Sequence, residues 1–135
     1  MKKITTLASL VLCIVTLVPA AVVAQQALDG SIYAVQGGAV PEFFNFSVSG
    51  PTFIATILTF GNGGNGRWFA AFGTTDGVSG AGQILVPTGF NLTQPAGATL
   101  QFQLDQADAL AGSFATTGLD AFLSVKAGRF VRVFP

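Results

Sequence analysis

The sequence contains no histidine, and its single cysteine, Cys13, lies in an apolar segment close to the N-terminus. The rest of the chain therefore has neither the base nor the thiol that Ser-His-Asp and Cys-His hydrolases require. Zinc and copper sites also depend on histidine and cysteine ligands. We therefore expect a protein that is not an enzyme and that holds neither a metal nor a cofactor.

Charge is scarce as well, because only 9% of the residues are charged and the formal net charge is zero. Lys2 and Lys3 account for two of the six basic residues, so the remainder of the chain is slightly acidic. A surface that binds nucleic acid needs a concentration of basic side chains. The composition therefore predicts no nucleic acid among the partners of this protein.

The N-terminal segment has the plan of a secretory signal peptide. The two lysines precede an uncharged stretch from Ile4 to Ala24, and Val22-Val23-Ala24 fits the small-x-small pattern of a cleavage site. We expect cleavage between Ala24 and Gln25, which divides the chain into a signal peptide, 1–24, and one all-β domain, 25–135. The mature protein is then exported to the periplasm or to the extracellular space.

A retained membrane anchor is the alternative, because the apolar run is nearly long enough to span a bilayer. Pro19, and the absence of basic stop-transfer residues after the run, favour cleavage instead. A large residue, Leu12, directly precedes Cys13, whereas lipidation of a cysteine needs a small residue there, so we expect no lipid anchor. Since Cys13 lies in the leader, the expected exported domain has no cysteine and no disulfide, and its core alone must hold it together.

Phenylalanine and glycine are abundant, with 13 and 17 residues, and they mark a succession of strands and turns. From Phe44 to Val48, apolar residues alternate with Asn and Ser, which is the period of a strand with one buried face. The stretch from Phe53 to Phe60 is apolar or β-branched almost throughout, which favours a central strand. The segments Ser49 to Thr52 and Gly61 to Gly66 are rich in turn residues and are expected to join these strands.

Further strands follow at similar spacing. The alternation is clearest from Ala98 to Asp105, where Leu100, Phe102 and Leu104 are expected to point inward. The predicted strands are Asp29 to Val35, Phe44 to Val48, Phe53 to Phe60, Arg67 to Phe72, Ser79 to Val86, Ala98 to Asp105, Leu110 to Thr117, and one long or two short strands within Ala121 to Phe134. About eight strands built from hairpins predict an all-β fold, either a single antiparallel β-sandwich or a small β-barrel.

Three aromatic residues, Tyr33, Trp68 and Phe69, are the candidate ligand-binding residues. Together they could form a face that binds a sugar or an apolar ligand, because aromatic rings offer a large, rigid contact area. The alternative is that they belong to the core of a sheet that is rich in phenylalanine.

Other motifs suggest chemistry that the predicted structure does not favour. Asp105, Asp108 and Asp120 offer the carboxylate pair of a glycoside hydrolase or oxygen ligands for Ca²⁺. All three lie in or beside predicted turns, where aspartate commonly makes local hydrogen bonds, so we assign them neither role. The segment Gly61 to Gly66 matches the dinucleotide-binding pattern, but a strand follows it where that pattern needs a helix.

The C-terminal segment, Arg129 to Pro135, resembles the last strand of an outer-membrane barrel. Such strands alternate between apolar and polar side chains. Here Arg132 shares its face with Phe130 and Phe134, and the predicted strands are short for a tilted membrane span. We therefore expect no association with a membrane once the leader has been removed.

Segments throughout the predicted domain share a pattern of glycine and aromatic residues. They are Gly30 to Tyr33, Phe44 to Val48, Gly64 to Phe69 with Gly73, Ala98 to Leu104, and Lys126 to Phe134. This pattern resembles a family of poorly characterised secreted bacterial β-domains, which reads G-x-W-aromatic, then W-Y-T-Y-D, then G-x-P-x-W. The departures are Ile32 and Ile57 in place of tryptophan, Gly61 in place of aspartate and Gly66 in place of proline. The resemblance implies a secreted β-domain without implying a particular activity.

These observations predict a non-catalytic, exported β-domain that acts as a structural or interaction module. Its partner would be a surface, a matrix or a protein, and self-association through the uncharged, phenylalanine-rich sheet is one form that this can take. The alternative is a β-barrel that binds a small ligand or a carbohydrate in an aromatic-lined cavity or on an aromatic face.

Overall fold

The computed structural model describes residues 25–60, 66–88, 90–93, 97–106, 109–119, 123 and 125–135, without the side chain of Leu92. The predicted signal peptide, Asp108 and Asp120 lie outside these residues. Within them, helical structure is confined to 25–28, and no helix is long and apolar enough to cross a membrane.

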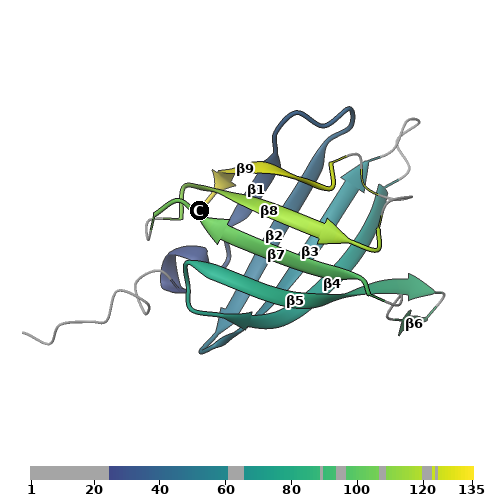
Figure 1. The fold of residues 1–135 in the computed structure, drawn as a ribbon, viewed down its shortest axis with the longest axis horizontal. Coiled ribbons are helices and arrows are strands. Elements are labelled where there is room, and N and C mark those ends of the chain that lie inside the picture. The colour runs from purple at the N-terminus through teal and green to yellow at the C-terminus, as the bar shows by residue number, and fades with distance from the viewer. Residues whose placement is uncertain are drawn as a thin grey trace, which may run out of the picture.

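Nine strands make up most of the described chain, and they confirm the prediction of an all-β fold (Figure 1). They are β1 (Ile32–Val35), β2 (Glu42–Ser49), β3 (Thr52–Phe60), β4 (Gly66–Thr75), β5 (Ser79–Thr88), β6 (Asn91–Thr93), β7 (Thr99–Leu104), β8 (Ala111–Thr117) and β9 (Ala127–Phe134). Each predicted strand overlaps one of these. The short strand β6 was not predicted; it lies between two of the predicted strands and pairs with the end of β5.

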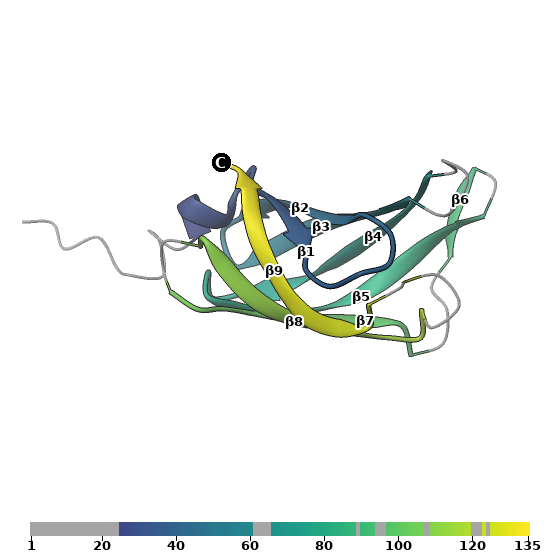
Figure 2. The same ribbon diagram turned by 90° about the horizontal axis from the view of Figure 1, so that it is seen from above.

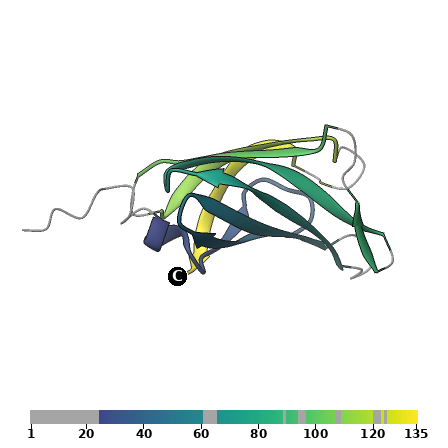
Figure 3. The ribbon, with the colours of Figure 1, turned by 90° about the horizontal axis from the view of Figure 1, so that it is seen from below.

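Eight of the strands close into an antiparallel β-barrel. They are β1 to β5 and β7 to β9. Each pairs with the next of these eight, with β5 paired to β7, and β9 returns to pair with β1. The sheet therefore has no free ends except at the β5–β6 extension. This closure decides between the two predicted architectures in favour of the barrel. The barrel is flattened, with β2, β3 and β4 on one side and β7 and β8 on the other (Figures 2 and 3).

The interior of the barrel is filled by aromatic rings. The alternation predicted for β2 and β7 is confirmed, since Phe44, Phe46, Leu100, Phe102 and Leu104 are all buried. The ring of Phe46 lies 4.9 Å from that of Phe102, and the ring of Phe44 lies 4.9 Å from that of Phe114. Rings at these separations attract one another beyond the area that they bury, so the interior is a packed core.

The predicted first strand is shorter than expected at its N-terminal end. Asp29 is not in a strand: it follows the helical turn 25–28 and accepts a 2.7 Å hydrogen bond from the backbone N–H of Val48. Gly30 then takes a φ of 75°, which a side chain would disfavour, and the chain turns into β1. Leu28 of the helical turn is completely buried in the hydrophobic core. This segment therefore packs against the barrel instead of adding to its wall.

Candidate functional site

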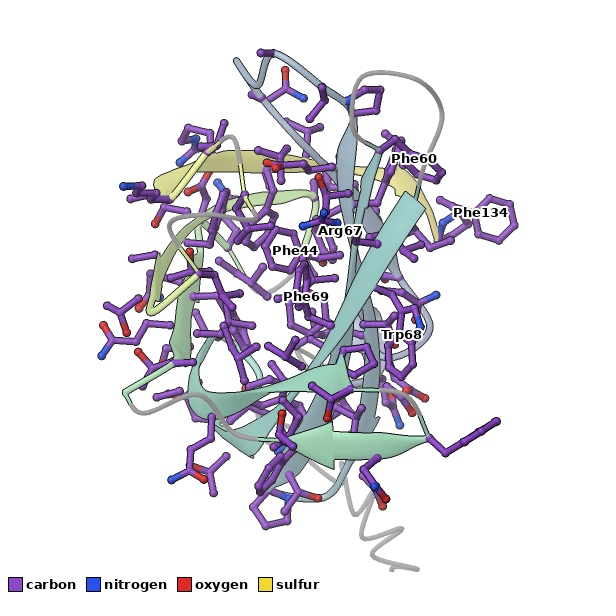
Figure 4. The ribbon with its side chains drawn as sticks, turned by 90° about the vertical axis from the view of Figure 1, so that its right-hand side faces the viewer. Phe44, Phe60, Arg67, Trp68, Phe69 and Phe134 are labelled. Atoms are coloured by element: carbon purple, nitrogen blue, oxygen red, sulfur yellow. The ribbon has the colours of Figure 1, made fainter. Side chains whose placement is uncertain are left out.

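The three candidate ligand-binding residues do not share one surface. Tyr33 is completely buried, and its hydroxyl donates a 2.7 Å hydrogen bond to the carbonyl oxygen of Ala109. Phe69 is only 2% exposed, whereas Trp68 is 46% exposed. Figure 4 shows Phe69 on the interior side of β4 and Trp68 pointing away from the barrel. Tyr33 and Phe69 therefore belong to the core, and of these three residues only Trp68 offers its aromatic ring to a partner.

Trp68 belongs to a group of exposed apolar residues on the outer surface of β3 and β4, which we term the outer apolar face. Its members are Ile54, Leu58, Phe60, Trp68 and Phe72. Their exposed fractions lie between 36% and 57%. Leu58 lies directly opposite Trp68, and Ile54 directly opposite Phe72, in the register of the two strands. The face is thus continuous across the β3–β4 pair.

The apolar character of β3 on both sides explains why this face exists. Strand β3 is central, as its sequence predicts, because it pairs with β2 and with β4. A central strand in a layered fold is covered on both faces, but the wall of a barrel has an interior on one side only. Phe53, Ala55 and Ile57 occupy that interior. The alternate residues of β3 face outward, where no described element covers them.

The described outward positions of β2 to β5 around the outer apolar face carry no charge, although Arg67, from the inward side of β4, lines a hollow together with Trp68. Besides the face itself, the outward positions of β2 to β5 include Phe43, Asn45, Ser47, Thr56, Ala70, Thr74, Ala81, Gln83 and Leu85. Phe43 extends the face onto β2, with its ring 6.2 Å from that of Phe60. The face is therefore an apolar area with an uncharged polar rim.

A polar row closes one end of the barrel on its interior side. Glu42, Thr59 and Arg67 occupy facing positions on β2, β3 and β4. Glu42 is 2% exposed and accepts a 3.4 Å hydrogen bond from the Thr59 hydroxyl. Figure 4 shows Arg67 on the same side of β4 as Phe69, the face that the alternation predicts for it. No motif pointed to Glu42, and the only signal was its place two residues before the inward Phe44.

The strands β4 and β5 diverge next to Trp68 and leave a notch in the wall. Their pairing ends at Ala70 opposite Leu85, and β5 continues from Val86 with β6 as its partner. A hollow of about 380 Å³ opens there, lined by Arg67, Trp68, Phe69, Val86 and Pro87. A second and wider hollow of about 710 Å³ borders the β4–β5 turn and the strands β7 and β8. Both are open to solvent.

The acidic residues do not assemble into a site among the described residues. Asp105 forms a two-pronged ion pair with Arg129, in which Nη1 of Arg129 donates a 2.7 Å hydrogen bond to Oδ1 of Asp105. This hydrogen bonding holds the pKa of the Asp105 carboxyl below its ordinary value and raises that of Arg129. The described chain also brings no three acidic, histidine or cysteine side chains together in the manner of a metal site.

Comparison with known proteins adds no family or relative. No family model matches the chain, and no significant match was found among the curated proteins. The function is therefore inferred from the geometry of the barrel and from the outer apolar face.

Proposed function

We propose that the chain is an exported, non-catalytic interaction module, of the secreted β-domain kind that its sequence resembles, and that the outer apolar face is its binding surface. Export follows from the plan of its N-terminal segment. The observation that supports binding is the contiguous exposure of Ile54, Leu58, Phe60, Trp68 and Phe72. At typical side-chain areas, the three aromatic rings alone expose roughly 270 Å², and monomeric proteins rarely expose apolar patches beyond a few hundred Å².

The fold does not require these side chains to be apolar. The core is formed by inward residues such as Phe46, Phe53 and Phe102. Polar residues at the outward positions would be equally compatible with the strands of the barrel. The outward side of β7 illustrates this, since Gln101 and Gln103 are exposed there. An apolar side chain that a partner covers completely contributes about 1.5–3 kcal/mol. A partner is therefore the physical reason that best accounts for the outer apolar face.

The binding of a small ligand or carbohydrate is the second candidate, and the notch beside Trp68 supports it. Its volume of about 380 Å³ lies within the usual range for ligand sites. Trp68 and Pro87 would offer flat surfaces to a sugar ring. The aromatic rings occupy the barrel interior, so this candidate rests on the outside of the wall and not on an internal cavity.

A paired set of variants tests the proposed function. Trp68→Ser with Phe72→Ser removes the two aromatic rings of β4 from the outer apolar face, and Gln101→Ser with Gln103→Ser is the matched control on β7. The readouts are the oligomeric mass of the purified protein and its retention on cells and matrix of the source organism. We expect the wild type and the control to associate or to be retained. In the Trp68→Ser, Phe72→Ser variant, association or retention should fall at least tenfold. A wild type that is monomeric at high concentration and is not retained would overturn the proposal.

A fluorescence titration with small ligands distinguishes the second candidate function, ligand binding in the notch, from partner binding. Trp68 is the only tryptophan, so its emission reports directly on a ligand in the notch. Saturable changes with a panel of simple sugars and apolar compounds, lost in Pro87→Ala together with Val86→Ser, would favour ligand binding over partner binding.

A further inference from the structure

The outer apolar face has a relief of ridges and a groove. Across β3 and β4, the facing pairs are Ile54 with Phe72, Thr56 with Ala70, Leu58 with Trp68, and Phe60 with Gly66. The first and third pairs are bulky and exposed, whereas Thr56 and Ala70 are small and half-buried. Successive pairs lie about 6.8 Å apart along the strands. The Thr56–Ala70 pair is therefore the floor of a groove between two ridges.

We propose that the outer apolar face binds the same face of a second copy of this chain, in a two-fold symmetric dimer. The inference rests on the proposed function, because it names the partner of that same surface. It commits to a specific packing, in which the Leu58–Trp68 ridge of each copy lies in the Thr56–Ala70 groove of the other.

The positions of large and small residues support this packing. Consider a two-fold axis that runs across the strands, between the Thr56–Ala70 and Leu58–Trp68 pairs. It places the Leu58–Trp68 pair of each copy over the Thr56–Ala70 pair of the other. The same axis places Phe72 of one copy over Gly66 of the other, and Ile54 over Phe60. Every large residue of β4 then meets a small residue of the second copy, as the pairing of the strands dictates. Sheets that pack face to face in this way keep their strands within about 30° of each other.

The absence of charge on the described outward positions of β2 to β5 favours the same partner. In a two-fold interface each side chain near the axis meets its own symmetry mate, so a single charge there would face an identical charge. The outer apolar face and its rim avoid this. The opposite outer wall does not, since Asp105 and Arg129 lie there.

The size of the face is sufficient for a dimer. With its rim on β2 and β5, the face covers four strands at about 4.8 Å spacing and ten residues at about 3.3 Å, which gives a footprint of roughly 600 Å². The accessible area of a surface with ridges exceeds its flat footprint, so the face approaches the ~800 Å² per partner that stable interfaces bury. A lipid surface is the less suitable partner, because amphipathic surfaces that bind anionic lipids carry several basic side chains beside the apolar area, and Arg67 is the only basic residue in the described strands β2 to β5.

Filling the groove tests the packing directly. Ala70→Phe makes the outer apolar face more apolar but removes the space that receives Trp68 of the second copy. Ala115→Phe, at an exposed outward position of β8, is the matched control. The protein is secreted from an expression host, so that any leader is processed, and its mass is measured by sedimentation from about 1 to 100 μM, the usual range for modest dimers.

We expect a wild-type dimer that Ala115→Phe retains and that Ala70→Phe weakens at least 100-fold, with circular dichroism showing all three folded alike. Trp68 emission should shift to shorter wavelength with concentration in the wild type and not in Ala70→Phe. A face that is merely adhesive would associate as well or better with the added ring, and that result would overturn the inference.

The failure of the dimer can be distinguished from the failure of the proposed function. A monomeric wild type overturns the dimer, and retention on cells that the Trp68→Ser, Phe72→Ser variant loses would then leave the proposed function standing with another partner. A monomer that floats with zwitterionic phosphatidylcholine vesicles would overturn the dimer and assign a lipid surface. A monomer with none of these interactions overturns both.

Discussion

The hydroxyl of Tyr33 donates a 2.7 Å hydrogen bond to the carbonyl oxygen of Ala109, which lies 76 residues further along the chain. Both residues are completely buried. Ala109 has a φ of 56°, and it is the only non-glycine residue with a positive φ in the described part of the chain. Since the left-handed conformation costs about 1–2 kcal/mol for a residue with a side chain, this hydrogen bond holds the turn after β7 in a strained backbone conformation.

We expect Tyr33→Phe to destabilise the protein by about 1–3 kcal/mol, the usual cost of leaving a buried polar group without its partner. The variant keeps the ring that packs 4.6 Å from Phe130, so the loss reports on the hydroxyl and not on packing. Urea unfolding, followed by circular dichroism, measures the difference. A variant as stable as the wild type would mean that the Ala109 carbonyl finds another donor.

Replacement of a ring in the core should be far more costly than replacement of a ring outside it. Phe46 is completely buried and contacts the rings of Tyr33, Phe53 and Phe102. We expect Phe46→Ala to cost about 3–5 kcal/mol, and Phe46→Leu to cost less but to remain measurable if the alanine variant does not fold. Phe90 is fully exposed, at 109%, so Phe90→Ala should change the stability by less than about 0.5 kcal/mol. Equal effects of the two alanine substitutions on the urea midpoint would contradict an aromatic core.

The strands and their inward residues could be predicted because they depend on local alternation. Phe44 and Phe102 were each placed on the buried face of a strand from neighbours within a few residues, and each is buried. The closure of the barrel could not be predicted in this way. It depends on the pairing of β9 with β1, in which Val131 lies opposite Ala34, and no local pattern distinguishes that pairing from the edge of a sandwich.

The candidate site was predictable only in part. Trp68 and Phe69 are consecutive in a strand, so their side chains necessarily point to opposite sides. Their spacing alone was therefore sufficient to exclude the shared ligand face that was considered for them. The exposure of Trp68 depends instead on which side of β4 becomes the interior. The side of β4 that faces inward is set by the closure of the whole barrel, in which Phe69 and Ala71 belong to the core. The notch likewise depends on where β5 leaves β4 and pairs instead with β6, its neighbour in the chain.

A glycine pair at the β4–β5 seam should tolerate no side chain. Gly73 and Gly82 face each other across the two strands. A Cβ atom on Gly82 would lie 2.4 Å from the carbonyl oxygen of Phe72, which is backbone and cannot move aside. We expect Gly82→Ala to destabilise the barrel by about 1–3 kcal/mol or more through overpacking.

Gly66→Ala is the matched control for that substitution, because its Cβ would lie 3.5 Å from the nearest side-chain atom, an ordinary contact. Both variants are compared by thermal unfolding at a concentration below that of any self-association. A melting temperature for Gly82→Ala close to that of Gly66→Ala would contradict this expectation. It would show that β4 and β5 can move apart enough to accommodate a Cβ atom on Gly82.

Asp76 gives the turn between β4 and β5 a dependence on pH. Its carboxylate accepts hydrogen bonds from the backbone N–H groups of Ser79 at 2.6 Å and of Val78 at 2.8 Å, and from the Ser79 hydroxyl at 3.0 Å. These bonds, with that from the Ser79 N–H the strongest, hold the pKa of Asp76 below its ordinary value of 3.8. The folded protein therefore binds this proton less readily than the unfolded chain does.

We therefore expect the stabilisation from Asp76 to be complete above its ordinary pKa and to be lost as the pH falls through the lower pKa of the folded state. Asp76→Asn keeps the side-chain shape but cannot ionise, so the variant should be less stable than the wild type near pH 6 and should approach it near pH 2. Urea midpoints at the two pH values measure the difference in stability between the wild type and Asp76→Asn, which should decrease from pH 6 to pH 2. A gap of the same size at both would show that the carboxylate charge contributes nothing to the turn, and that Asp76 acts there only through its shape.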